Sequence, residues 1–335
     1  MSEITKRERV TAALRGHPVD RPPISFWGHD FLREWTAEGL AAAMLEPVRA
    51  FDYDYLKVNP RACYFAEAWG CRYRPSGDGS RGPETEHWVL REASDLRTIT
   101  PADVQAGSFG EQLEALRLIA GELEGEVPFV QTVFSPLSVI DRMANSDRDL
   151  VRRWMAEEPA ALHAALEPVT ETLATYSRAA LGAGADGIFF ATTEWGTRDA
   201  CSDEEYDAFG RPYDLRVLAA AEGAPMNILH VCRGNNRLES LLDYPVAAVN
   251  WAVHAPDNPS LADIAGRTEK AVMGGLNERR TLLSGSPDEV RAQVQEAITQ
   301  TKGERFLAGP GCAISPLTPP SNLRAAVEAV RAPRP

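Results

Sequence analysis

The sequence predicts an α/β fold, a single (β/α)8 barrel over residues 1–335 with a hairpin-like insertion after its second strand. Short apolar, β-branched runs alternate with segments of helical periodicity along the chain. There are eight such runs, and this alternation is typical of a parallel sheet that closes into a barrel. No Pro/Gly/Ser-rich linker divides the chain, and no glycine-rich dinucleotide fingerprint follows the first run, which disfavours an open doubly wound sheet.

The predicted strands are residues 23–26, 55–58, 128–133, 187–190, 226–230, 246–250, 271–273 and 305–307. Helical periodicity is clear between several of them, at residues 159–181, 204–221 and 287–301. Residues 71–90 interrupt the alternation and have the pattern of two short strands around a Gly/Pro-rich turn. Since this segment follows the second strand, we expect it on the catalytic face of the barrel, as a lid or as a stabilising flap.

Composition excludes several classes of partner. The 335 residues carry 35 Lys+Arg against 48 Asp+Glu, a formal charge of −13, which does not suit a general nucleic-acid binder. The chain has no polybasic stretch, no apolar run of the roughly 20 residues that span a bilayer, and no apolar signal core at its start. We therefore expect a cytoplasmic protein without membrane or nucleic-acid partners.

Five cysteines, an odd number without a secretion signal, do not form a disulfide framework. Two of them, with one histidine, carry the strongest pattern. His230 and Cys232 are two residues apart at the end of a predicted strand, so they point to one face. Cys312 follows the last predicted strand, and both strands end at the rim where barrels place active sites. An imidazole and two thiolates form a zinc-type ligand set whose open fourth position is typical of catalytic sites. A hydrogen-bonded histidine and two buried cysteines are the simpler alternative.

Other rim positions are candidates for binding substrate, because side chains after barrel strands face the active site. They are Trp27, Asn59, Arg61, Tyr64, Trp195 and Asn250. Arg61 could pair bidentately with a carboxylate or phosphate, or form an ordinary surface ion pair. Trp195 could close an apolar side of the pocket, although core packing is an equally simple role.

Glu194 and His29 are the candidate catalytic acid/base groups. Glu194 ends the fourth strand on the same rim as the three ligands, where it is also a candidate fourth ligand or the partner of Arg198. His254 is another candidate for the fourth position. Water or substrate could equally occupy it, and the sequence leaves this choice open.

Three segments carry a family resemblance: residues 9–23, residues 273–277 and the stretch 306–325 with its Gly-Pro-Gly-Cys turn. Together they resemble the uroporphyrinogen decarboxylase superfamily, and the resemblance covers essentially the whole chain. It implies a (β/α)8 barrel. It also implies one of two chemistries, true decarboxylation or zinc-dependent methyl transfer to a thiol, as in the methylcobamide:coenzyme M methyltransferases.

The chain departs from the decarboxylase pattern at three places. The arginine-rich segment near the first strand is replaced by residues 26–35, which hold one arginine; the Phe-Ser-Asp motif is replaced by residues 56–61; and the Gly-His-Gly motif becomes Gly309-Pro-Gly311. The thiol methyltransferase pattern, His-x-Cys followed much later by Cys in a Gly-rich turn, matches His230, Cys232 and Cys312. The glutamate ligand of the related methionine synthases is missing, because that region begins with Asn250.

The resemblance implies a zinc-dependent methyltransferase that moves a methyl group from a corrinoid or another donor to a zinc-activated thiol. A corrinoid, supplied by a partner protein, and a homodimer are both compatible with it. The first alternative is a metal-independent decarboxylase of the superfamily's founding type. The others are a zinc-bearing binding protein without turnover, and a lyase or hydrolase that uses zinc-bound water with Glu194 or His29 as base.

Overall fold

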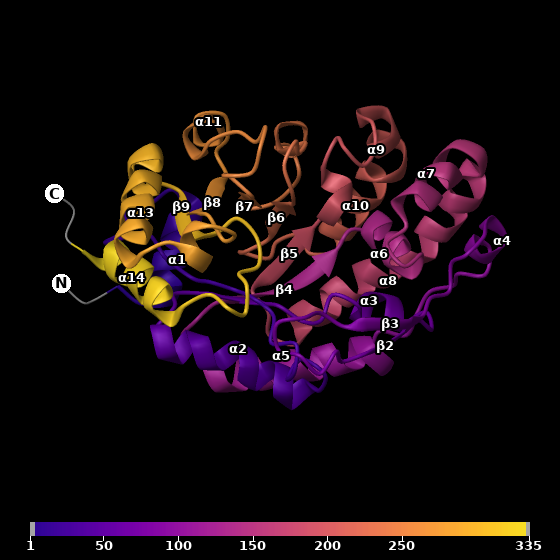
Figure 1. The fold of residues 1–335 in the computed structure, drawn as a ribbon, viewed down its shortest axis with the longest axis horizontal. Helices are drawn as coiled ribbons and strands as arrows, with labels where there is room; N and C mark the ends of the chain where they lie inside the picture. Colours follow the sequence, from indigo (N-terminus) through magenta and orange to yellow (C-terminus); the bar gives the residue numbers. More distant parts are fainter. Residues whose placement is uncertain (1–3, 333–335) are drawn as a thin grey trace.

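A seven-stranded parallel sheet forms the centre of the molecule in the computed structural model, which describes residues 4–332. The strands pair in the order β1-β4-β5-β6-β7-β8-β9, and the sheet curls into a trough surrounded by helices (Figure 1). Its strands are β1 (Leu56–Val58), β4 (Phe129–Phe134), β5 (Gly187–Ala191), β6 (Ile228–Val231), β7 (Ala248–Trp251), β8 (Ala271–Leu276) and β9 (Phe306–Pro310). The α/β alternation predicted from the sequence is therefore present.

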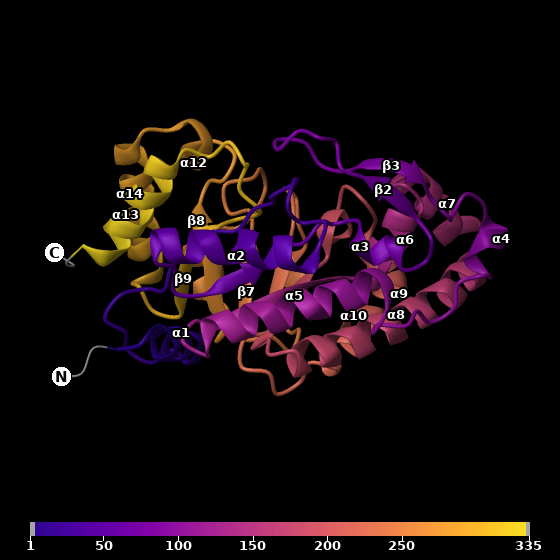
Figure 2. The same cartoon turned by 90° about the horizontal axis from the view of Figure 1, so that it is seen from below.

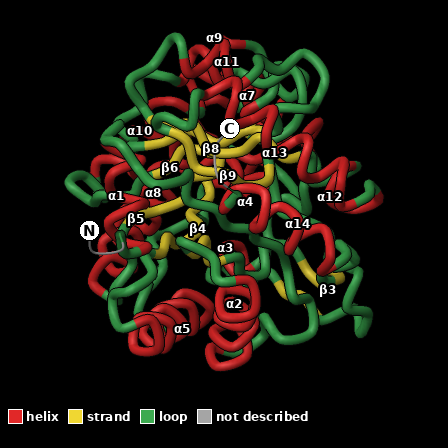
Figure 3. Tube along the Cα trace, turned by 90° about the vertical axis from the view of Figure 1, so that its left-hand side faces the viewer, coloured by secondary structure: helices red, strands yellow, loops and turns green. Residues whose placement is uncertain are grey.

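The helices pack around the outside of the sheet, and the view in Figure 3 shows the strands at the centre of a ring of helices. The longer helices are α1 (Lys6–Arg15), α2 (Ala37–Phe51), α5 (Gly107–Leu123), α6 (Pro136–Met143), α7 (Arg148–Glu157), α8 (Pro159–Gly182), α10 (Arg211–Ala219), α13 (Pro287–Thr301) and α14 (Pro320–Arg331). The shorter ones are α3 (Tyr64–Glu67), α4 (Ala93–Leu96), α9 (Asp203–Phe209), α11 (Leu261–Ala265), α12 (Thr281–Ser284) and the 3-10 turns η1 (Thr193–Gly196) and η2 (Leu238–Leu241). Among residues 4–332, no helix combines the length and the apolar character needed to cross a membrane.

The predicted first strand, residues 23–26, is not a regular strand, which corrects the sequence prediction. Ile24 makes only an isolated parallel bridge to Ala308 of β9. The segment nevertheless lies between the two edge strands, because the Ala308 amide donates to the Pro23 carbonyl at 2.8 Å and the Asp54 amide donates to the Ile24 carbonyl at 3.0 Å. Pro22 and Pro23 have no N–H to donate, so a continuous ladder cannot form here.

Two apolar layers hold the sheet. The larger cluster lies between the outer face and the helices, and a smaller one fills the inside of the curl, with members from the sheet and from α1. Phe189 and Met273 belong to the inner cluster and Trp27 closes it at the mouth. Side chains at the carboxyl ends of the strands therefore line the top of a packed interior, as in barrel enzymes.

The segment after β1 contains a small antiparallel sheet of β2 (Arg72–Arg74) and β3 (Glu84–His87), drawn in violet at the edge of the molecule in Figure 2. The turn between its strands approaches the segment after residue 28. A Cβ on Gly79 would lie 3.5 Å from Leu32, and one on Gly82 would lie 3.7 Å from Phe31. The turn thus covers the chain beside the mouth of the sheet.

Candidate metal centre

One histidine and two cysteines meet at the carboxyl ends of β6 and β9. The ligand atoms of His230, Cys232 and Cys312 all lie within 4.8 Å of one another, and the two sulfur atoms are 3.8 Å apart. His230 is buried, and both cysteines are partly exposed. The structure therefore brings together the three residues predicted as metal ligands, in a mutual arrangement that could hold an ion.

Strand geometry explains why these residues meet. His230 lies in β6 and faces the interior, where its ring stacks on Phe189 with centroids 5.2 Å apart. Cys312 is carried to the same place by the turn after β9, which passes close to the end of β7. A Cβ on Gly311 would lie 2.9 Å from the Trp251 carbonyl oxygen and 2.7 Å from Ala252 Cα, so only glycine allows this approach.

Asn250 fixes the orientation of the His230 ring. Its amide nitrogen donates to the carbonyls of Met273 (3.0 Å) and Pro310 (3.1 Å). Its oxygen therefore faces His230 Nδ1, at 2.6 Å, and accepts the hydrogen from that nitrogen. The lone pair of the neutral ring is left on Nε2, the tautomer that suits a metal ligand whose second nitrogen is held by the protein.

Burial and hydrogen bonding shape the charge of the cluster. The hydrogen bond between the two sulfur atoms lowers the pKa of Cys312 and raises that of Cys232, so one negative charge is stabilised on the pair. Glu278, two residues after β8, is buried beside the turn, where a Cβ on Gly311 would lie 3.2 Å from its Oε2. Burial raises the pKa of Glu278.

A cavity of about 360 Å³ opens at the cluster. Its wall includes Cys232, Cys312, His254, Glu278 and three arginines, Arg233, Arg279 and Arg280. His254, a candidate fourth ligand, lies here, but its Nε2 is 3.0 Å from the Gly275 carbonyl oxygen. A small molecule could therefore reach the two sulfur atoms from this side.

Glu194 lies outside the three-residue cluster. Its carboxylate is held between Arg233 and Arg148, the latter at 3.5 Å. The partner weighed from the sequence, Arg198, pairs instead with Asp203. In this arrangement the Glu194 charge is already compensated by two arginines.

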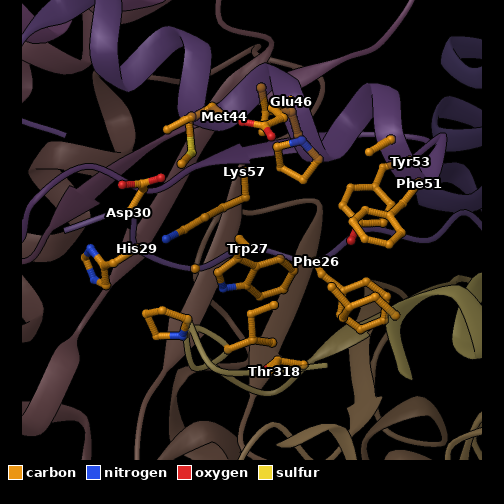
Figure 4. A pocket seen from close by; sticks show the side chains of 18 of the residues that line it. Phe26, Trp27, His29, Asp30, Met44, Glu46, Phe51, Tyr53, Lys57 and Thr318 are labelled. Carbon is orange, nitrogen blue, oxygen red and sulfur yellow. The ribbon is translucent and has the colours of Figure 1, made fainter. Parts of the chain in front are cut away.

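Trp27 and His29 lie at a second cavity of about 280 Å³, between the chain after residue 25, α2 and the turn after Cys312 (Figure 4). His29 Nδ1 is 2.9 Å from the carboxylate of Glu34, which is fully buried. Because a carboxylate only accepts, Nδ1 carries the hydrogen and Nε2 is the free nitrogen. His29 is therefore held in one tautomer by the protein.

The other predicted substrate contacts are occupied within the protein. Arg61 is buried, and its guanidinium binds the carboxylates of Glu67 and Glu111 and the carbonyl of Glu34. Tyr64 is buried and donates to the Thr132 carbonyl at 3.0 Å. Trp195 is completely buried in the larger apolar cluster. The structure does not bring these three side chains to the cluster.

Asn59 lies beside the second cavity, where its side-chain oxygen accepts a hydrogen bond from the ammonium of Lys57. Sequence reasoning missed Lys57 and Glu278. The signals were present but weak: a lysine within an apolar strand, and a carboxylate shortly after a strand end, at a rim position like those that were considered. Neither residue type is unusual enough in a sequence to show that its side chain is buried.

Comparisons with known proteins agree with this architecture. The chain is 24% identical to methylcobamide:CoM methyltransferase MtbA of Methanosarcina acetivorans, over 99% of both chains, and 26% identical to uroporphyrinogen decarboxylase of Nitrosococcus oceani, over 98% of this chain and 97% of the relative. The solved structure of a methyltransferase from Methanosarcina mazei superposes with a TM-score of 0.84 at 23% identity, covering 98% of both chains, and shares the fold. The model of the uroporphyrinogen decarboxylase (URO-D) family matches residues 5–333, so this chain belongs to the uroporphyrinogen decarboxylase family.

Proposed function

We propose that this chain is a zinc-dependent methyltransferase that transfers a methyl group from a corrinoid or another methyl donor to a thiol. The observation that carries the proposal is the cluster of His230, Cys232 and Cys312 at the carboxyl ends of the strands. The family includes relatives named as decarboxylases and relatives named as methyltransferases at similar identity. Family membership therefore does not select between the two reactions. The proposal depends on the three candidate metal ligands.

The separation of the ligand atoms fits zinc. Zn–S bonds are about 2.3 Å, so two thiolates on one tetrahedral zinc lie about 3.8 Å apart. The two sulfur atoms here are 3.8 Å apart, far beyond a disulfide. Two cysteines and one histidine are the soft and borderline ligands that zinc prefers, and three protein ligands leave a fourth position open.

We assign the fourth position to water or to the acceptor thiol. His254 is hydrogen-bonded to a backbone carbonyl and Glu194 is held by two arginines, so both proposed protein ligands have other partners. The cavity beside Cys232 and Cys312 gives a small molecule access to this position. When bound there, zinc would keep the acceptor sulfur as a nucleophilic thiolate near neutral pH.

The chain's own residues orient and enclose the reactants. Asn250 holds His230 in the tautomer whose Nε2 faces the cluster, which removes the need to reorient a ligand during turnover. His29, fixed by Glu34, presents a free Nε2 as the candidate acceptor of the thiol proton. Trp27 and Phe189 pack edge to face at the mouth, 5.7 Å between centroids, and exclude water on that side.

The structure disfavours decarboxylation of a polycarboxylate. Arg61, the arginine considered for a substrate carboxylate, is engaged by Glu67 and Glu111. The position compared with the carboxylate motif of the decarboxylases holds Asn59, which cannot act as an acid. The relatives named for methylcobamide make a corrinoid, supplied by a partner protein, the donor to test first.

The metal content of purified protein, with Cys232→Ala, Cys312→Ala and a matched control, Cys71→Ala, tests the proposal. Cys71 is a buried cysteine outside the cluster. We expect one zinc per chain in the wild type and in the control, and none in the other two variants. Loaded wild type should demethylate methylcobalamin with a thiol present, followed by absorbance, and both cluster variants should not.

Three outcomes would contradict the proposal. No metal uptake on reconstitution removes the zinc site. Stoichiometric zinc without methyl transfer to any thiol points to a binding protein or to zinc-bound water chemistry. Decarboxylation of a porphyrinogen that survives both cysteine substitutions would assign the founding activity of the family.

A further inference from the structure

Lys57 is a buried cation that forms no ion pair within residues 4–332. It lies in β1, is only 4% exposed, and its ammonium lies 4.8 Å from the centre of the Phe189 ring. Within residues 4–332 its one hydrogen bond goes to the Asn59 side-chain oxygen, and no carboxylate lies within ion-pair distance. The buried carboxylate of Glu34 is an acidic group near enough to favour the charged ammonium. A lone buried ammonium is costly, so such groups are usually retained for a function.

Open space adjoins this ammonium. Lys57 lines the cavity of about 280 Å³ together with Trp27, His29, Met44, Ile314 and Ser315. Figure 4 shows its side chain crossing the cavity, with the nitrogen directed toward the side of His29 and Asp30. The cavity's own carboxylates, Asp30 and Glu46, are both paired with Arg33, at 2.7 and 2.8 Å. Neither carboxylate of the cavity wall therefore pairs with Lys57, and an acidic ligand could do so.

One aromatic ring, that of Phe189, lies between the Lys57 ammonium and the candidate metal centre. Phe189 lies under the Lys57 ammonium on one side and stacks on His230 on the other. Ile314 and Ser315 of the cavity wall follow Cys312 in the same turn. The cavity of Lys57 therefore adjoins the turn that carries Cys312, although the three clustered residues do not line it.

We propose that Lys57 binds the acidic group of a small ligand, a carboxylate, sulfonate or phosphate, in this cavity. A volume of this size suits a small molecule and not a tetrapyrrole. The ammonium has three N–H donors and Asn59 takes one, so two remain for the oxygen atoms of an acid. The identification of this ligand as the thiol that accepts the methyl group rests on the function proposed above; the acid site itself does not.

A competing role for Lys57 is to balance the charges of Cys312 and Glu34, which both lie near enough to favour the charged ammonium. A divalent metal would neutralise the two thiolates and remove the demand from Cys312, so that Lys57 could bind an acid. The two roles differ in a measurable way, because charge balance requires no ligand. Acid binding by metal-loaded protein, and its dependence on Lys57, separates them.

The experiment titrates zinc-loaded protein, with metal-free protein beside it, using acids that carry no thiol: ethanesulfonate, propionate and methyl phosphate, with propionamide as the neutral control. Calorimetry gives the affinity. Trp27 lines the cavity and is one of seven tryptophans, so a fluorescence change that is lost in Trp27→Phe reports occupancy. Lys57→Met keeps the length of the side chain and removes the charge. Lys270→Met is the matched control, since Lys270 lies before β8 at the opposite end of the sheet.

We expect at least one acid to bind and propionamide not to bind, with affinity about tenfold or more weaker in Lys57→Met and unchanged in Lys270→Met. The three acids identify the preferred group. As a second readout in unaltered protein, the bound acid should protect Lys57, and not Lys270, from acetylation mapped by mass spectrometry. Equal binding to Lys57→Met, or no acid binding and no protection, overturns the acid site while leaving the zinc proposal intact. If the protein binds no zinc but still binds an acid through Lys57, the zinc proposal fails and the acid site stands.

Discussion

Lys57 and Asp214 are both buried ionisable residues with no ion-pair partner among residues 4–332, but their surroundings differ. Asp214, in α10, is completely buried and accepts hydrogen bonds from the hydroxyls of Tyr206 (2.6 Å) and Tyr244 (2.9 Å). Lys57 has one acceptor, Asn59, and otherwise faces a cavity. One oxygen of Asp214 thus accepts two hydrogen bonds in a closed interior, whereas Lys57 makes one hydrogen bond and adjoins open space.

This difference shows that a buried charge indicates a binding site only where open space adjoins it. Burial shifts both groups toward their neutral forms: it lowers the pKa of Lys57 to about 7 and raises the pKa of Asp214 to about 7. A shifted pKa therefore does not distinguish the two residues. The two residues are distinguished by the cavity beside Lys57 and by the tyrosines around Asp214.

The largest expected effect is on stability and comes from Lys57→Met in ligand-free protein. The pKa of Lys57 is about 7 when folded, against 10.5 for an ordinary lysine. The unfolded chain therefore binds the extra proton between these values, and wild-type stability rises with pH across that window. Below pH 7 the full cost is present, so Lys57→Met should be more stable there by about 5 kcal/mol.

Urea unfolding across the pH range measures this gain, which should shrink toward zero as the pH approaches 10.5. Lys57→Met should therefore gain stability and lose acid binding. A residue that destabilises the ligand-free protein and binds a ligand is retained for its function. A variant that is less stable than wild type at pH 6 would show that Lys57 stabilises the fold, and would break the contrast with Asp214.

Asp214→Asn should show a similar effect with the opposite dependence on pH. The pKa of Asp214 is about 7 when folded and 3.8 in an ordinary aspartate, so the folded state holds the proton between these values. Wild-type stability therefore falls as the pH rises from 3.8 to 7. The uncharged amide avoids this loss, and thermal unfolding at pH 8 should show a gain of about 4 kcal/mol.

At pH 4 the same two proteins should be equally stable, which makes the low-pH measurement the internal control. The substitution is nearly isosteric, and the oxygen that would become nitrogen, Oδ1, has no partner in the described structure. No gain at pH 8 would mean that the two tyrosine hydroxyls fully compensate the charge. The protein would then stabilise the Asp214 carboxylate better than its raised pKa indicates.

Local pattern predicted the parts of the molecule that depend on short-range geometry. Seven of the eight predicted strands form the sheet, because apolar runs bounded by turns suit buried parallel strands. The pair His230 and Cys232 needed only strand alternation to face one side. Cys312 was placed correctly because parallel strands end at one rim. The exception, residues 23–26, contains the proline that prevents a ladder.

What the sequence could not show depends on contacts between distant segments. Arg61 was predicted to contact substrate, yet Glu67 and Glu111 from two different helices occupy it, and no local pattern announces that pairing. Asn250 was predicted at the substrate, and the structure places its amide against His230 instead. Lys57 is in a short strand, where burial on the inner face follows only from the curl of the sheet.

The smallest of the expected effects concerns Asn250, a buried polar side chain whose oxygen and nitrogen are both satisfied. It thus resembles Asp214 in being enclosed, although it lies within the proposed site. Asn250→Leu removes the acceptor for His230 Nδ1, frees the ring to turn, and should weaken metal binding by about 10- to 100-fold. Competition with a chromophoric chelator measures that affinity without any need for turnover.

Asn250→Asp is the matched variant, because a carboxylate can still accept from His230 Nδ1 although it cannot donate to the carbonyls of Met273 and Pro310. If orientation of the histidine is what Asn250 supplies, the aspartate variant should bind metal within a few-fold of wild type. If both variants lose affinity equally, the two donated bonds, which connect β7 to β8 and β9, are the important ones. Asn250 would then hold the strand ends that bring Cys312 to the cluster, and the His230 tautomer would be a consequence of that packing.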